Sequence, residues 1–189
     1  MKIKNKIGEL FFQIIPVMIG VYLGFVVSSW SERREQNSKK KILAENIISE
    51  IKENKNNVLE VVEYHKMLRD SSRYYLNSDI TTTASFFRGI NTPSLVNSAY
   101  ETGIQTGLLN ELSIDRIQSL NRVYKTQNTI DNFTNIMLTG LVSMDLGKDK
   151  KSTKKILNFL SITMEDVALL ENQLINDYNH VLNNMSDNK

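Results

Sequence analysis

An uncharged run from Leu10 to Trp30 constrains this chain more than any other feature of its sequence. The run holds about 21 residues without Asp, Glu, Lys or Arg, and as an α-helix it would extend about 31 Å. That length matches the hydrocarbon core of a bilayer. A core helix of a soluble domain would normally carry a polar face, whereas this run is apolar on every side. We therefore expect a transmembrane helix over residues 10–30.

A cleavable signal peptide is the main alternative to a retained span. Three lysines precede residue 7 and form a basic leader, and residues 27–29 offer a passable small-residue cleavage site. The apolar region, however, is longer than the roughly 7 to 15 residues of a signal peptide. It also ends at Trp30, whose amphipathic ring suits the headgroup level of a membrane. These features favour a single-pass span that is retained.

Aromatic and basic residues follow the span and form its expected membrane-interface anchors. A basic cluster of this kind attracts anionic lipid headgroups, and it also serves as a stop-transfer flank. Because more Lys and Arg follow the span than precede it, the positive-inside rule leans towards a cytoplasmic domain, although a signal-anchor orientation would place the domain outside. The predicted anchors are Trp30, Arg33, Arg34, Lys39, Lys40 and Lys41.

One face of the expected span carries small and polar residues. Gly20 and Gly24 form a GxxxG, and Ser28 extends it by one more turn. On a helical wheel Gln13 lies within about 20° of both glycines, whereas Tyr22 faces the opposite side. Small residues let two helices approach closely, and a glutamine on the same face can hydrogen-bond to a neighbour. The pattern predicts self-association through this face, with incidental glycines as the alternative.

Beyond the span, helical periodicity dominates and predicts an all-α fold. Residues 41–76 carry a heptad-like seam, and the absence of Pro and Gly between Gly24 and Gly89 predicts that the span continues into this helix. Asn54 lies on the seam, where it would either fix the register of a helix pair or sit at a wet edge of an intramolecular bundle. The seam comprises Ile47, Ile51, Asn54, Val58, Val61, His65, Leu68, Ser72 and Tyr75.

The remaining chain is predicted to complete a helical bundle. Phe86 and Phe87 are expected to form an apolar plug in a loop over residues 77–92. The predicted helices are 92–103, opened by Thr92-Pro93 and stopped at Gly103; 113–147, opened by Ser113 and ended by Gly147; 152–159; and 163–183, opened by Thr163. The predicted organisation is a basic tail (1–9), the span (10–30), a long juxtamembrane helix (31–76) and the rest of the bundle (77–189).

Composition and motifs argue against several function classes. The chain has no cysteine, which excludes disulfides and thiolate metal sites. Residues 31–189 hold equal numbers of basic and acidic side chains, which argues against nucleic acid as a partner. His65 is expected to be a core residue and His180 a surface residue, and no catalytic or phosphate-loop motif is present. We expect neither an enzyme nor a bound cofactor.

The N-terminal half resembles an uncharacterised family of bacterial single-span membrane proteins, whose span ends in a Trp-x-Glu-Arg motif and leads into a helical domain. The resemblance implies a bacterial inner-membrane location and no known activity. It covers roughly residues 7 to 130 and departs at Ser28-Ser29, where the family usually has an Asn before the Trp. The residues that carry it are Ile7-Gly8-Glu9, Gly20, Trp30-Ser31-Glu32-Arg33, Ser98-Ala99-Tyr100-Glu101, Gly107, Leu120 and Tyr124.

The sequence thus predicts a protein that acts through contacts, as a homo-oligomer or as an accessory subunit of a membrane complex. Its expected partners are membrane lipids and other membrane protein subunits. The alternative is a membrane-tethered sensor or transport-associated module that binds a small ligand within the helical bundle, which is a normal place for such sites.

Overall fold

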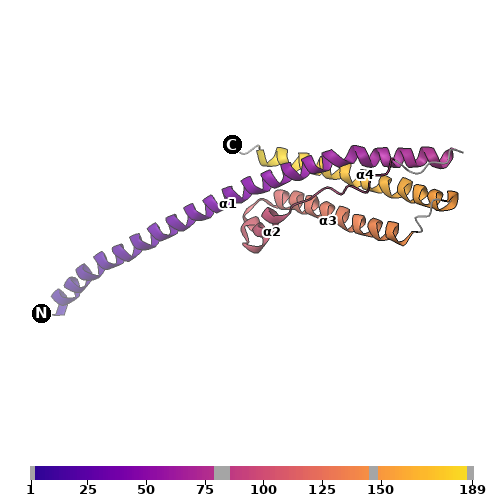
Figure 1. Ribbon diagram of the computed structural model, residues 1–189. Helices are drawn as coiled ribbons and strands as arrows, with labels where there is room; N and C mark the ends of the chain where they lie inside the picture. The colour runs from indigo at the N-terminus through magenta and orange to yellow at the C-terminus, as the bar shows by residue number, and fades with distance from the viewer. Residues whose placement is uncertain (1–2, 79–85, 145–148, 187–189) are drawn as a thin grey trace. The chain divides into compact units, whose positions relative to one another are not determined.

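Helices account for all the regular secondary structure that the computed structural model describes. The model describes residues 3–78, 86–144 and 149–186, with side chains from residue 14 to 185. No strand occurs within these ranges, which confirms the predicted all-α class. The elements are α1 (Ile3–Asn77), α2 (Ser98–Gln105), the short 3-10 helix η1 (Leu108–Glu111), α3 (Ile114–Ser143) and α4 (Lys150–Ser186) (Figure 1).

The chain divides into two units, Met1–Leu43 and Ala44–Lys189. The first unit consists of the N-terminal part of α1, and the second contains the rest of α1 with all the other elements. α1 passes through the boundary without a break in its helical conformation, as predicted from the lack of Pro and Gly after Gly24. Pro16 lies inside the helix in the first unit.

The second unit is a bundle of three long helices, the C-terminal part of α1 with α3 and α4, which lie side by side (Figure 1). α3 and α4 are antiparallel, because Gln127 bonds to Tyr178 while Gly140 meets Phe159. A Cβ added at Gly140 would come within 3.0 Å of the Phe159 ring, so this glycine allows close packing of the two helices. The seam residues of α1 that are buried in this bundle are Ile47, Ile51, Asn54, Val58, His65, Leu68 and Ser72.

An extended segment over residues 87–97 replaces the first part of a predicted helix. The helix expected to open at Thr92-Pro93 is wrong, since α2 begins only at Ser98. Pro93 is instead buried, and because proline has no N–H to satisfy, it suits an extended segment held by side chains of α1. The predicted end near Gly103 is two residues early, and Gly103 itself is buried inside the helix. α2 continues to Gln105, and the left-handed conformation that follows belongs to Gly107 at φ +72°.

The helix starts differ in how well the sequence predicted them. α3 begins after Ser113 as predicted, and it ends at Ser143, while Gly147 lies outside the described residues. The predicted break between residues 159 and 163 is wrong, because α4 is one helix. The Thr163 hydroxyl donates to the Phe159 carbonyl at 2.8 Å, one turn back, so it is used within the helix and caps nothing.

The loop that was predicted to carry an apolar plug lies only partly within the described residues. Residues 79–85 lie outside the described residues, but Phe86 and Phe87 are half-buried against a cluster that includes Leu68 and Met164, as predicted. Phe86 also stacks on Tyr75, with ring centroids 5.5 Å apart. The aromatic plug therefore closes the end of the bundle where α1 ends.

Candidate functional site

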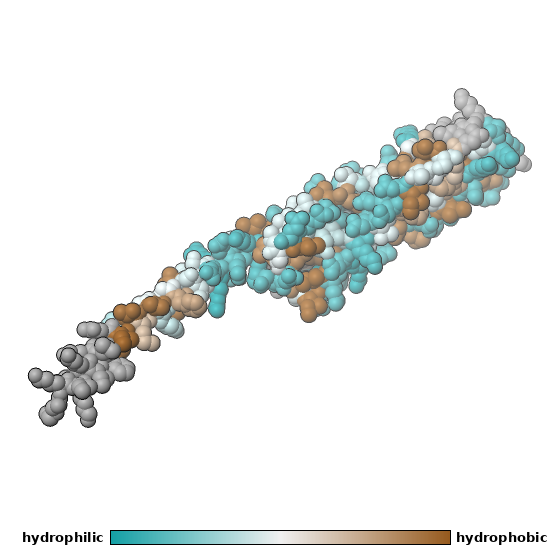
Figure 2. Space-filling model, turned by 90° about the horizontal axis from the view of Figure 1, so that it is seen from below, coloured by the Kyte–Doolittle hydropathy of each residue, from teal (hydrophilic) through white to brown (hydrophobic). Residues whose placement is uncertain are grey.

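The N-terminal part of α1 presents an apolar surface on all sides. Among the described residues, α1 is the one helix long and apolar enough to cross a membrane. None of its apolar window is buried, and side chains such as Val21, Phe25 and Val27 are at least 63% exposed. Hydrophobic residues gather on this part of the helix in Figure 2, and hydrophilic ones follow it along the chain. The surface of this unit is therefore apolar where the sequence predicted a span.

The face predicted for self-association is open where the structure describes it. A Cβ added at Gly20 or Gly24 would meet nothing within 4 Å. Ser28 is exposed, and its hydroxyl lies 3.4 Å from a Glu32 carboxylate oxygen one turn on, which makes a long hydrogen bond. The side chain of Gln13 lies outside the described residues. Small residues thus leave a shallow strip along one side of the helix, to which a second helix could approach closely.

The predicted interface anchors are aromatic and charged residues that follow the apolar surface along α1. Trp30 is 64% exposed, and the Arg34 guanidinium lies 5.8 Å from its ring centroid, within the range of a cation–π contact. Lys39 forms an ion pair with Glu35 at 2.7 Å. Arg33 and Lys41 are exposed, and Lys40 is half-buried. An aromatic ring followed by cations is the order of side chains found at a membrane interface.

In the second unit, α1 supports the extended segment and α2 with buried polar side chains. Glu50 is only 6% exposed, and one of its carboxylate oxygens accepts hydrogen bonds from the Ala99 N–H at 2.7 Å and the Ser98 hydroxyl at 3.2 Å. The other oxygen accepts from the Tyr124 hydroxyl at 2.6 Å. Burial, and then the hydrogen bond and charge of Glu50, raise the pKa of Tyr124, so the phenol keeps its proton. Glu50 thereby caps α2 and ties it to α3.

Asn54 makes the most specific contact with the extended segment. Its side chain is fully buried, its amide donates to the Val96 carbonyl at 2.6 Å, and its amide oxygen accepts from the Val96 N–H at 2.8 Å. One turn on, the Asn57 amide donates to the Ser94 carbonyl at 2.7 Å. Asn54 thus lies on the seam as predicted, but both predicted roles are wrong: it is fully buried and not at a wet edge, and it fixes the register of a non-helical segment of its own chain and not of a helix pair.

His65 and Glu171 form a buried ion pair between α1 and α4. The ring Nδ1 lies 2.9 and 3.0 Å from the two carboxylate oxygens, and Nε2 lies 2.5 Å from the Ile90 carbonyl. Both ring nitrogens therefore face acceptors, which is the arrangement of a protonated imidazole. Burial acts to lower the pKa of His65, but the Glu171 carboxylate and the carbonyls of Ile90 and Asn91 outweigh it, and the pKa is raised.

These polar contacts hold the bundle together. His65 is a satisfied core residue, as predicted, and each acceptor of Glu50 and Glu171 described above has a donor from the protein itself. Within the described residues, no three His, Cys, Asp or Glu side chains gather in a way that could hold a metal ion. The burial of Glu50 and Glu171 is not predicted by the sequence analysis. The one sequence signal for their burial is that each carboxylate lies beside apolar positions of an amphipathic helix.

Comparisons with protein-family models, with curated proteins and with solved structures find no match to this chain. The physical features of the two units are therefore the basis for a function. The first offers an apolar helix with a strip of small residues. The second offers a bundle whose seam is filled by its own chain.

The stability of the bundle should fall as the pH rises through the native pKa of His65. Because this pKa is raised above the ordinary value of 6.5, the ion pair contributes fully below that value and its contribution is lost on deprotonation at higher pH. Urea unfolding of the full-length protein between pH 6 and 9 measures the effect. At pH 6, His65→Leu alone should cost about 3–5 kcal/mol, because it leaves the Glu171 charge buried and unpaired.

The double variant His65→Leu, Glu171→Leu is the matched control. It removes both charges, so it should be more stable than His65→Leu and should lose the pH dependence of this pair. If the free energy of unfolding of the double variant depended on pH as strongly as that of the wild type, another group would be responsible for the pH dependence.

Proposed function

We propose that this protein is a single-pass, membrane-anchored helical protein that acts through protein contacts. The observation that carries the proposal is the apolar part of α1, which is long enough to cross a bilayer and lies exposed on all sides. A core helix of a soluble bundle would be buried by its neighbours, whereas no side chain of this window is. The Trp30 ring and the cations beyond it support a membrane boundary at this point.

The proposed location is a bacterial inner membrane, and it rests on the resemblance to the single-span family together with the span itself. The basic flank leans towards a domain on the cytoplasmic side. Membrane lipids are then the first partners of the chain, through the apolar surface and the interface anchors.

The proposed contact surface is the strip of Gln13, Gly20, Gly24 and Ser28. The seam of α1 from Ile47 onwards is filled by the chain's own helices, so it offers nothing to a second copy. Contact with another subunit is therefore assigned to the span alone. A homo-oligomer uses this strip on both helices, and an accessory subunit uses it against a different membrane protein.

We expect the protein to stay integral to the membrane. An apolar helix of this length is held by the bilayer, so washing membranes with alkaline carbonate should leave the full-length chain in the pellet. Immunoblotting of pellet and supernatant, with N-terminal sequencing of the chain, measures the result. Recovery in the supernatant, or a chain that begins near Trp30, would show a peripheral or processed protein.

The side of the membrane can be tested by fusing alkaline phosphatase after Lys189. A cytoplasmic domain should give low phosphatase activity in intact cells, because the enzyme needs an oxidising compartment. A fusion to green fluorescent protein at the same residue is the complement and should fluoresce. High phosphatase activity with a dark fluorescent fusion would place the domain outside.

Bulky side chains on the strip should separate the helices without preventing insertion. Gly20→Leu, Gly24→Leu adds apolar surface, so the variant should insert normally yet run as a smaller species in mild detergent. Gln13→Leu should weaken the assembly by about 1 kcal/mol per contact. Analytical ultracentrifugation in detergent and mass photometry in nanodiscs measure the size.

Tyr22→Leu is the matched control, since it lies on the opposite face and should change little. A wild-type protein that is monomeric in both media would refute the homo-oligomer. A glycine variant that keeps its size while Tyr22→Leu loses it would refute the choice of face.

A further inference from the structure

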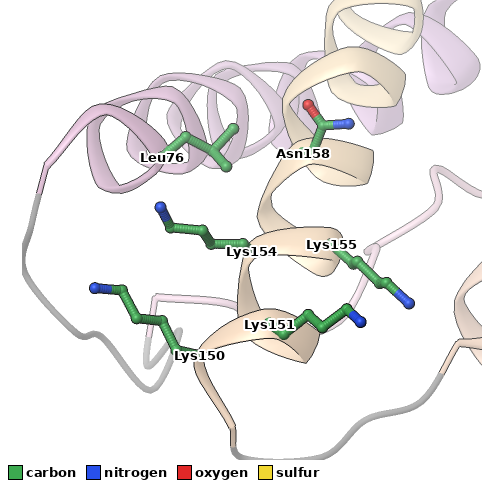
Figure 3. Close-up of a pocket in the computed structure, with 6 residues that line it drawn as sticks. All are labelled: Leu76, Lys150, Lys151, Lys154, Lys155 and Asn158. Atoms are coloured by element: carbon green, nitrogen blue, oxygen red, sulfur yellow. The ribbon is translucent and has the colours of Figure 1, made fainter.

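A groove lined by four lysines lies at the end of the bundle where α1 ends and α4 begins. Its volume is about 640 Å³, it is open to solvent, and its walls are Leu76, Lys150, Lys151, Lys154, Lys155 and Asn158. In Figure 3, Lys150 and Lys154 extend on the side of α4 that faces Leu76, and Lys151 and Lys155 extend on the other. All four lysines are exposed.

The positions of these four lysines are unfavourable for a helix. They occupy the first two turns of α4, where the helix dipole disfavours cations. They also form two like-charge pairs one turn apart, Lys150 with Lys154 and Lys151 with Lys155, and such pairs repel. No hydrogen bond or ion pair from the described part of the chain reaches the four ammonium groups. By contrast, Lys66 pairs with Glu63 and Arg73 with Glu165 in the same unit.

The helix start itself is already satisfied. One Asp149 carboxylate oxygen accepts from the N–H groups of Lys151 at 2.9 Å and Ser152 at 3.0 Å, and the other accepts from the Ser152 hydroxyl at 2.6 Å. An incoming anion would therefore be held by the lysine side chains and not by backbone amides. A sequence that breaks two helix rules at one place without compensation within the described residues marks that place as a functional candidate.

We propose that this groove binds a ligand that carries several phosphate groups. Each lysine pair one turn apart can hold one phosphate between two ammonium groups, and the ligand removes the repulsion that the bare helix carries. All four cations are lysines, which bind phosphate as point charges on flexible stems. The groove is wide open to solvent, so a short phosphate chain can lie along it. Leu76 and the lysine stems give it an apolar floor.

The test uses sodium tripolyphosphate and the full-length protein in neutral-lipid nanodiscs. Isothermal titration calorimetry should show binding that weakens as salt is added. Lys150→Gln, Lys154→Gln should weaken it by about tenfold or more, because it removes the pair beside Leu76. Lys52→Gln, Lys55→Gln removes the same charge from α1, several turns before Leu76, and should leave the affinity within about twofold. The wild-type melting temperature should rise with tripolyphosphate, and that of the groove variant should not.

A folding defect is separable from a binding defect, since the groove variant loses repulsion and should melt no lower than the wild type without ligand. Flotation with phosphatidic acid vesicles, against phosphatidylcholine vesicles, tells whether the phosphate source is a lipid headgroup or a free molecule. Equal affinity in wild type and groove variant, or an equal loss in the control variant, overturns the proposal. So does tighter binding of a short single-stranded DNA than of tripolyphosphate, which would indicate a general polyanion surface.

Discussion

The backbone of the segment between α1 and α2 must find hydrogen-bond partners, and the helical unit depends on how it does so. A partly buried backbone that joins neither helix nor sheet leaves its N–H and C=O groups to side chains. α1 supplies them in order: Tyr64 and His65 reach Gly89 and Ile90, Asn54 reaches Val96, and Glu50 caps α2. The segment therefore runs antiparallel to α1, and its register is set residue by residue.

This arrangement explains why polar residues are tolerated on an otherwise apolar seam. A buried amide or carboxylate without partners would destabilise the bundle, but Asn54 pairs with backbone groups and His65 pairs with Glu171 and with the Ile90 carbonyl. The same contacts specify one arrangement, since a shift of α1 by one turn would break both hydrogen bonds between Asn54 and Val96 and would separate His65 from Glu171. Apolar seam residues alone would tolerate such a shift more easily, because leucine and isoleucine have no directional bonds.

The seam, the all-α class and the start of α3 could be predicted because period and capping residues are local signals. The extended segment could not, because Pro93 after a threonine is equally compatible with a helix start. What decides between them is Asn54, about forty residues earlier in the chain, which offers the segment a better set of hydrogen bonds. The continuity of α4 was missed for a related reason. Thr163 can cap a new helix or donate within an existing one, and no glycine or proline forces the break.

The candidate sites also differ in whether the sequence alone could predict them. The strip of Gly20, Gly24 and Ser28 is visible from spacing alone, whereas the pairing of His65 with Glu171 joins residues over a hundred positions apart. In the bundle, the buried side chains of Glu50, Asn54, His65 and Glu171 pair with groups of the same chain. The surfaces proposed here for recognition are instead exposed ones, the apolar N-terminal part of α1 and the lysine groove at the start of α4. These two surfaces differ in chemistry, one apolar and one cationic, so a partner that binds one has no reason to compete for the other.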